Sequence, residues 1–259
     1  MLTSVRSVLA ATAIAGATLV ATPAFAEESD SDITVSGNVA LVTDYRFRGV
    51  SFTDGKPAIQ GGVDIAHSSG VYVGTWASSL EDSATYGSIE LDLYAGWSGD
   101  ITPGLTLDVG LLYYAYPSKD SVSEGAGPSD YFEPYMSLGT TIGPVSATAG
   151  VAYAWDQKSL GSEDNLYLYF DLEAGIPNTP ITLTGHVGYT DGALAPDYVS
   201  GVSTDKSAID WSIGASATVL GGLSLGVSYI GVEDGGLKSL GLDDDFTDDA
   251  VVGTLSYSF

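Results

Sequence analysis

The sequence predicts an all-β protein, a transmembrane up-and-down antiparallel β-barrel of about 12 strands preceded by a cleaved signal peptide. Three observations predict it: many segments alternate apolar and polar residues, the chain begins with an export signal, and it ends in an aromatic strand, Gly253 to Phe259. Period-two alternation indicates strands with two different faces. A terminal strand with one apolar face and a final phenylalanine suits a lipid interface.

Residues 1–26 have the pattern of a signal peptide. Arg6 supplies the positive charge, Val8 to Val20 is the apolar core, and Ala24-Phe25-Ala26 is a small-x-small cleavage site. The barrel domain then covers residues 27–259. Export together with a barrel predicts a location in the bacterial outer membrane.

Twelve alternating segments follow, and tight turns alternate with longer polar connections between them, as in barrels with short periplasmic turns and long extracellular loops. The first segment places Tyr45 and Phe47 on its apolar face, and we expect no plug inside the barrel. The expected strands are 33–48, 57–66, 70–79, 87–98, 104–116, 130–141, 145–156, 164–175, 181–190, 206–219, 223–232 and 249–259.

The alternation alone does not say which face is inside, and a soluble sandwich would turn its apolar faces inward. Two features favour apolar faces that meet lipid. The segments reach about 10–13 residues, which suits tilted membrane strands, whereas soluble strands average about 5–6. Aromatic residues also gather near the ends of the apolar faces, as in membrane girdles. The girdle residues are Trp97, Tyr113, Trp155, Tyr229, Tyr257 and Phe259.

The charge balance is strongly acidic, with 33 Asp and Glu against 8 Lys and Arg and a net charge of −25. Nucleic-acid binding is excluded, because it needs basic residues against phosphates. The chain has no cysteine, so it has no disulfide framework and no thiolate metal site. The acidity is also typical of proteins from a saline habitat, and that alternative stays open.

Several runs resemble the TorF-type porin family, a group of proteobacterial outer-membrane proteins of unknown function. They are Asp44 to Ala58, Gly70 to Ser78, Glu90 to Gly96 and Tyr114 to Pro117. The likeness is densest over about 35–120 and continues as a barrel pattern to the end. The resemblance implies an outer-membrane location and passage of solutes, and it supplies no substrate, cofactor or catalytic residue.

If the apolar faces meet lipid, the opposite faces line a lumen rich in carboxylates, which predicts a preference for cations. Arg46 and Arg48 pair structurally with acids across the barrel or act in permeation, and both interpretations stay open. The bulky members of the set narrow the path or close it, because twelve strands enclose less space than a wide porin. The expected lumen residues are Asp44, Arg46, Arg48, Asp64, Tyr72, Trp76, Glu90, Asp92, Tyr94, Asp108, Glu133, Asp171, Glu173 and Asp210.

We expect no defined metal site and no cofactor. An acidic run near the C-terminus is a weak candidate for loose divalent binding, and a solvated acidic loop is the alternative. Its residues are Asp243, Asp244, Asp245, Asp248 and Asp249.

An enzyme is not expected. The phospholipase alternative needs a Ser nucleophile and a His base on the lipid-facing exterior. His67 falls in a short turn and His186 on a face read as lumenal.

The predicted function is a narrow, cation-leaning channel for small solutes. The alternative is a non-conducting barrel with a structural or adhesive role through its acidic extracellular loops. Expected partners are outer-membrane lipid and lipopolysaccharide, the barrel-assembly machinery through the C-terminal strand, and small solutes or cations. Small outward side chains are compatible with a homo-oligomer.

Overall fold

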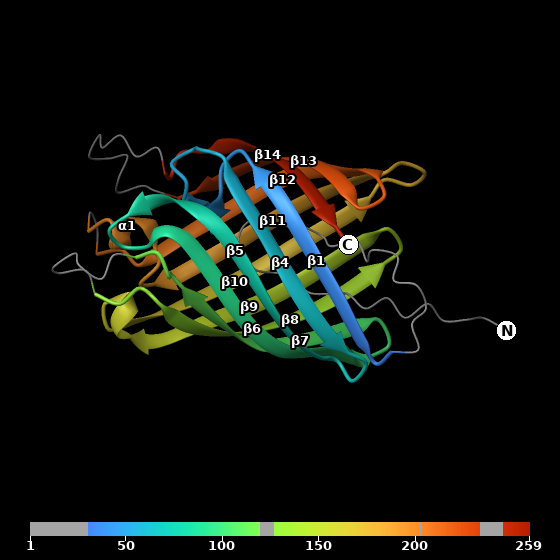
Figure 1. The fold of residues 1–259 in the computed structure, drawn as a ribbon, viewed down its shortest axis with the longest axis horizontal. Helices are drawn as coiled ribbons and strands as arrows, with labels where there is room; N and C mark the ends of the chain where they lie inside the picture. The colour runs from blue at the N-terminus through green and yellow to red at the C-terminus, as the bar shows by residue number, and fades with distance from the viewer. Residues whose placement is uncertain (1–30, 120–126, 202–203, 234–245) are drawn as a thin grey trace.

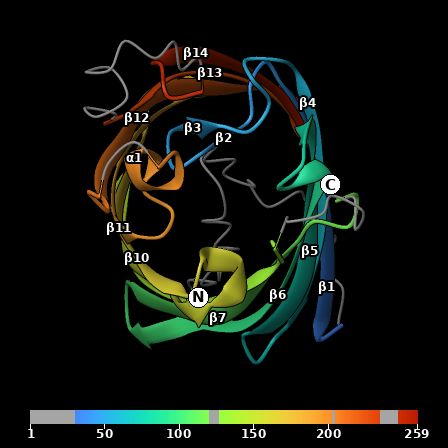
Figure 2. The same ribbon diagram turned by 90° about the vertical axis from the view of Figure 1, so that its left-hand side faces the viewer.

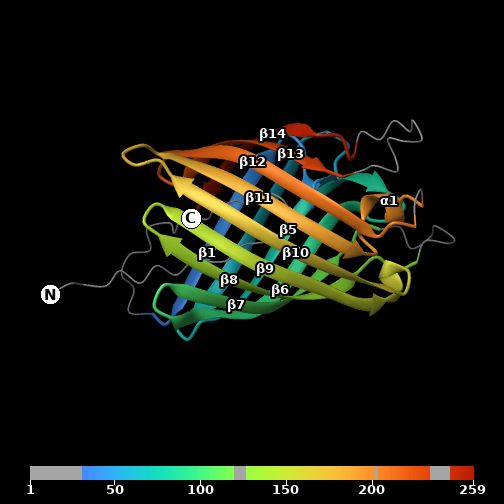
Figure 3. The same cartoon turned by 180° about the vertical axis from the view of Figure 1, so that it is seen from behind.

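The described part of the chain forms one closed barrel (Figures 1 and 3). The computed structural model describes residues 31–119, 127–201, 204–233 and 246–259, so the expected signal peptide lies outside the described residues. Strands that follow one another along the chain pair antiparallel, which confirms the predicted fold class. The wall strands are β1 Ile33–Val42, β4 Ala58–His67, β5 Val71–Ser83, β6 Gly87–Thr102, β7 Leu105–Ala115, β8 Tyr131–Ile142, β9 Val145–Gln157, β10 Glu163–Gly175, β11 Ile181–Gly192, β12 Ser207–Leu220, β13 Leu223–Val232 and β14 Ala250–Ser258.

The C-terminal strand closes the ring. β14 pairs with β1 in a register that sets Val39 opposite Tyr257. The last residue takes part as well, because Gly37 N donates to Phe259 O at 2.9 Å and Phe259 N donates to Gly37 O at 3.0 Å. Closure leaves no edge strand in the described wall of the barrel, as a barrel in lipid requires.

The apolar face of the strands points outward. Ile59, Ile213 and Val251 are 66%, 64% and 68% exposed, whereas the neighbouring inward residues Gln60 and Val252 are buried. An apolar belt of this extent is unfavourable in water and favourable against acyl chains. The interior is the enclosed axis of a barrel instead of a dry layer between two sheets, so the protein is an outer-membrane barrel. None of the helices among the described residues is long and apolar enough to cross a bilayer.

The two ends of the barrel differ. One end, called here the turn-side end, carries the short connections 68–70, 103–104, 143–144, 176–180 and 221–222. The opposite, loop-side end carries η1 Lys158–Leu160 and α1 Pro196–Val199 (Figure 1). Following the rule for outer-membrane barrels, the turn-side end faces the periplasm and the loop-side end faces outward.

The first strand and the expected absence of a plug are corrected by the structure. β1 ends at Val42, and residues 43–57, called here the lumen hairpin, fold into the barrel (Figure 2). The hairpin contains β2 Arg46–Phe47 and β3 Val50–Ser51. Tyr45 and Phe47 are therefore buried inside the barrel, not exposed to lipid. The alternating pattern continues past the end of β1 because the hairpin also has two unlike faces, which sequence alternation alone does not distinguish from a longer wall strand.

A smaller difference occurs at the end of β5. The strand continues to Ser83 with an irregular register against β6, where the sequence predicted a loop over 80–86. Leu80 is buried inside the barrel as a result.

Candidate functional site

The lumen hairpin is held together by a buried polar cluster. The carboxylate of Asp44 accepts hydrogen bonds from Arg46 Nε at 2.6 Å, Ser51 Oγ at 2.6 Å and Thr53 Oγ1 at 2.9 Å. Arg46 Nη1 donates to the backbone oxygens of Gly49 at 3.0 Å and Asp248 at 2.5 Å. Arg46 is thus paired within the hairpin and with the last loop, whereas the structural alternative considered from the sequence placed its partner across the barrel.

Arg48 extends from the hairpin tip to the barrel wall. Its Nη2 lies 2.8 Å from both carboxylate oxygens of Glu133 on β8, and its guanidinium carbon lies 4.1 Å from the centre of the Tyr167 ring on β10. Burial lowers the pKa of Arg48, but the adjacent Glu133 carboxylate outweighs burial and the pKa stays above its ordinary value. The hairpin is therefore bound to the wall by a charged side chain.

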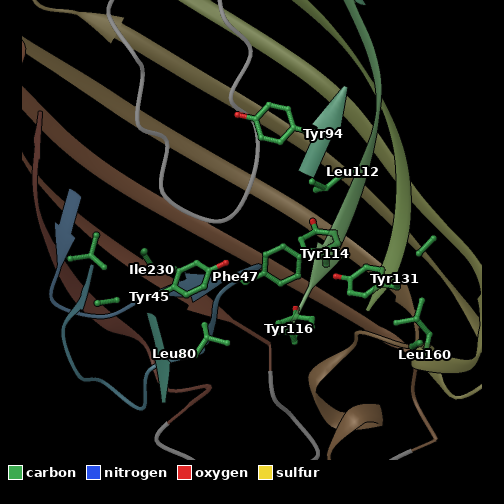
Figure 4. Close-up of a cluster of buried hydrophobic side chains, with 14 of the residues drawn as sticks. Tyr45, Phe47, Leu80, Tyr94, Leu112, Tyr114, Tyr116, Tyr131, Leu160 and Ile230 are labelled. Atoms are coloured by element: carbon green, nitrogen blue, oxygen red, sulfur yellow. The ribbon is translucent and has the colours of Figure 1, made fainter. Parts of the chain in front are cut away.

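Aromatic rings fill the loop-side half of the interior (Figure 4). Tyr114 and Tyr131 stack with centroids 4.4 Å apart, and Phe47 meets Tyr114 edge-on at 5.8 Å. Rings from the wall and from the hairpin thus pack as one group, called here the loop-side aromatic cluster. Its members are Tyr45, Phe47, Phe52, Trp76, Tyr86, Tyr114, Tyr116 and Tyr131, and the packing continues towards the turn-side end through Tyr94, Tyr72 and Tyr135.

Two predicted lumen acids lie against this cluster on β6. Glu90 and Asp92 are 1% and 0% exposed. Tyr45 Oη donates to Glu90 Oε1 at 3.1 Å. Neither carboxylate oxygen of Asp92 has a hydrogen-bond partner among the described residues. Asp92 stands between Trp76 and Tyr114 in the strand register. These acids are enclosed by rings instead of water, and their burial is unfavourable without a cation or proton.

The turn-side half is lined by tyrosine–aspartate pairs. Tyr72 Oη donates to Asp108 Oδ1 at 2.6 Å and also contacts the hydroxyl of Tyr135. Tyr94 Oη donates to Asp64 Oδ1 at 2.5 Å. Neutral hydroxyl donors stabilise a carboxylate without cancelling its charge.

Glycines in the neighbouring strands give these tyrosines room to lie along the wall. A Cβ at Gly110 would overlap the ring of Tyr135, and a Cβ at Gly150 would overlap the ring of Tyr169. The same relation holds between Gly74 and Tyr94. Covering a strand glycine with an aromatic ring is a known way to support it. The rings therefore cover the wall.

A histidine joins two further predicted acids. His186 Nδ1 lies 2.6 Å from Asp171 Oδ1, and its Nε2 lies 3.0 Å from Asp210 Oδ1. The hydroxyl of Tyr167 lies 2.9 Å from the same Nε2. This group connects β10, β11 and β12 across the inner wall. His67 is exposed and contacts Ser69 within its turn.

The structure thus places the predicted lumen residues inside the barrel in separate groups. Asp44, Arg46 and Arg48 belong to the hairpin, where the sequence put them on the wall. Glu173 is partly exposed on the turn side, two residues along β10 from Asp171 of the histidine group. The part these residues play in permeation stays a prediction. The sequence did not predict that Ser51, Phe52 and Thr53 lie inside the barrel. The one signal for the hairpin was the turn-forming pair Arg48-Gly49, which lies between the two short strands Arg46–Phe47 and Val50–Ser51.

The predicted girdle residues lie near the two ends of the outer surface. Tyr113 Oη donates to Asp130 at 3.0 Å, and Tyr229 Oη donates to Asp249 at 2.9 Å, both at the loop-side rim. At the turn-side end Tyr257 and Phe259 stack with centroids 6.3 Å apart. Trp97 is partly exposed, and Trp155 is exposed.

The acidic run considered for divalent ions is only partly described. Asp243, Asp244 and Asp245 lie outside the described residues. Asp249 accepts the hydrogen bond from Tyr229, and the backbone of Asp248 accepts one from Arg46. In the described ranges no group of three His, Asp or Glu side chains is arranged to hold a metal ion.

Comparison with known proteins gives a family and a fold. The profile of the family described as "Bacterial protein of unknown function (Gcw_chp)" matches residues 26–259, and the TorF-type name is not confirmed. No curated protein sequence matches the chain. The NanC porin is similar in structure at 10% identity with a TM-score of 0.56, covering 87% of this chain and 99% of its own. The KdgM porin is similar at 8% identity with a TM-score of 0.57, covering 86% and 99%. At this identity the likeness establishes the fold alone.

Proposed function

We propose that this chain, which belongs to the Gcw_chp family of bacterial proteins of unknown function, is a non-enzymatic outer-membrane channel that passes small solutes and prefers cations to anions. The observation that carries the proposal is the charge of the inner wall. The twelve wall strands contain no lysine or arginine in the described residues, whereas carboxylates recur along their inner faces. An acidic lining attracts cations and repels anions.

The arrangement of the acids supports a negative lumen. Asp64 and Asp108 receive hydrogen bonds from tyrosine hydroxyls, which carry no compensating charge. Arg46 and Arg48 are the buried basic residues of the hairpin, and each is already matched to a carboxylate. Asp171 and Glu173 are partly exposed inside the turn-side half. A solute entering from that end therefore meets the carboxylate of Glu173, whereas Asp171 is paired with His186.

The same charge pattern separates this barrel from one of its structural neighbours. A similar structure is described as the KdgM porin in complex with disordered oligogalacturonate. Galacturonate units carry carboxylates, and an inner wall without basic residues disfavours them by like-charge repulsion. The proposed solutes of this chain are accordingly small cations and neutral molecules.

The placement of the histidines supports a non-enzymatic role. His186 lies inside the barrel and is hydrogen-bonded to two acids and a tyrosine. A phospholipase would need its histidine base beside a serine on the lipid-facing exterior. Lipase assays on detergent-solubilised protein are expected to give no turnover above background.

The test of the channel is planar-bilayer recording on the purified protein. We expect discrete openings, and a reversal potential in a KCl gradient that shows preference for K⁺. The combined variant Asp64→Asn with Glu173→Gln, which removes two negative charges from the lumen, should lower the preference several-fold. A control with the same charge change, in which the rim acids Asp82 and Asp100 are neutralised, should keep it.

One observation favours a non-conducting barrel as the second candidate. The lumen hairpin and the loop-side aromatic cluster fill much of the interior at one end. Persistent electrical silence of folded protein in bilayers would reject the channel and support a structural or adhesive role. An anion preference in open channels would reject the proposed charge selectivity.

A further inference from the structure

The lumen hairpin crosses the barrel. It leaves the wall between β1 and β4, and its Arg48 ends on β8 and β10. In the strand order around the ring, β8 and β10 lie on the far side from β1. Figure 2 shows β2 and β3 inside the ring of strands. One arginine therefore joins the hairpin tip to the opposite wall.

The tip of the hairpin holds Arg48 in an unfavourable backbone conformation. Arg48 and Gly49 have φ of 49° and 81°, which is the pattern of a type I′ turn. That turn prefers Asn, Asp or Gly at the first position, and a long side chain there costs on the order of 1 kcal/mol. The contacts of the guanidinium offset this cost, so the turn is held in place by the wall site.

The groups that receive Arg48 belong to the wall and form a set suited to a planar cation. Glu133 supplies both carboxylate oxygens, and Tyr114 Oη donates to one of them at 3.2 Å. Tyr167 supplies a ring face. A carboxylate next to an aromatic face is the chemistry that recognises guanidinium and other organic cations. These three residues, called here the wall cation site, lie on β8, β7 and β10, so their backbone belongs to the wall and not to the hairpin.

A second buried acid, Asp92, lies beside the wall cation site. Asp92 lies opposite Tyr114 in the register and close enough for its charge to interact with that of Glu133. Among the described residues, neither carboxylate oxygen of Asp92 has a hydrogen-bond partner. Arg48 Nη1 has none either. Acceptors and a donor are thus left unused, so Arg48 fits the site incompletely.

We infer that Glu133, Tyr114 and Tyr167 form a binding site for small guanidinium-type cations, and that Arg48 occupies it as a built-in competitor. A free guanidinium ion makes the same ion pair and ring contact without the constraint of the turn. The tethered arginine competes at a high effective concentration, so the site binds external ligand weakly until Arg48 leaves. The inference rests on the proposed function only in treating the ligand as a solute of the channel.

The test is calorimetric titration of methylguanidinium chloride into folded protein in detergent. Arg48→Ala should bind at least tenfold more tightly than the wild type, because the competitor is gone. Adding Glu133→Gln to Arg48→Ala should abolish the binding. Lys56→Ala removes a positive charge from the exposed base of the hairpin and should leave the wild-type affinity unchanged. Sodium and tetramethylammonium chloride should bind at least tenfold more weakly than methylguanidinium.

Equal affinity in the wild type and Arg48→Ala, or binding that survives Glu133→Gln, would overturn the inference. If Arg48→Ala does not fold, Arg48→Lys provides the same test, because a lysine makes fewer contacts and should be displaced more easily than arginine. The titration measures binding and does not depend on conduction, so it tests the wall cation site separately from the proposed channel. Tight binding with silent bilayers rejects the channel alone, and conduction without binding in Arg48→Ala rejects the wall cation site alone.

Discussion

The two halves of the barrel interior use the same wall in different ways. In the loop-side half, rings from the lumen hairpin pack against rings from the wall, and Glu133 is matched by Arg48. In the turn-side half, tyrosines lie over strand glycines and donate to acids that have no basic partner. The loop-side half is packed like a protein core, whereas the turn-side half has a single layer of polar side chains covering the wall. We therefore expect resistance to solute flow to concentrate at the loop-side half, and charge selection to occur in the turn-side half.

Removing the hairpin tests the first part of this comparison and should give the largest effect. Replacing residues 46–51 with two glycines takes away the ring of Phe47 and both arginines of the hairpin. We expect the single-channel conductance to rise several-fold, because the remaining twelve-stranded wall encloses an open path. Planar-bilayer recording measures it. A matched change at the other end, Pro177→Gly with Asn178→Gly, should leave conductance unchanged. Equal conductance with and without the hairpin would place the resistance elsewhere.

Truncating one ring in each half compares their packing. Tyr114→Ala removes a buried ring from the loop-side aromatic cluster and should lower the free energy of unfolding by about 3–5 kcal/mol, as large cavities in cores do. Tyr135→Ala removes a partly exposed ring from the turn-side half and should cost clearly less. Urea unfolding of the barrel in lipid vesicles, followed by fluorescence, measures both. Equal losses would contradict the division into a core-like half and a half with a single polar layer.

The glycines beneath the turn-side tyrosines offer a finer test. A Cβ at Gly150 would overlap the Tyr169 ring, so Gly150→Ala should push the ring from the wall and destabilise the barrel by roughly 1–3 kcal/mol. Gly139 also faces inward but has only Thr148 Oγ1 nearby, at 3.6 Å. Gly139→Ala is therefore the matched control and should be close to neutral. Urea unfolding again compares the two, and similar losses would show that ring placement does not depend on the glycine.

The strands of the barrel wall can be predicted from the sequence, whereas the lumen hairpin and its contacts with the wall cannot. Strand positions are predictable because alternation must persist wherever one face meets lipid, and the bounds of β13 agree with the prediction. The lumen hairpin has the same alternation for another reason, since it also separates two environments inside the barrel. Whether Arg48 would meet Glu133 depends on closure of the ring, which brings residues far apart in sequence together. Local patterns carry no information about that contact.

The exposed base of the hairpin should give the smallest effect, and it depends on pH. Lys56 Nζ pairs with Glu81 at 2.7 Å and with Asp54 at 3.3 Å, and the hydrogen bond to Glu81 raises the pKa of Lys56 above its ordinary value. A raised lysine pKa means that the pairing stabilises the fold below about pH 10.4 and is lost as pH rises through the folded-state pKa. Lys56→Gln should therefore melt slightly below the wild type at pH 8, and the gap should close by about pH 12. Tyrosines titrate in both proteins and cancel in the comparison. Because the pair is solvent-exposed, salt should also reduce the gap, and a gap that persists at high pH would show that Lys56 acts through packing instead of charge.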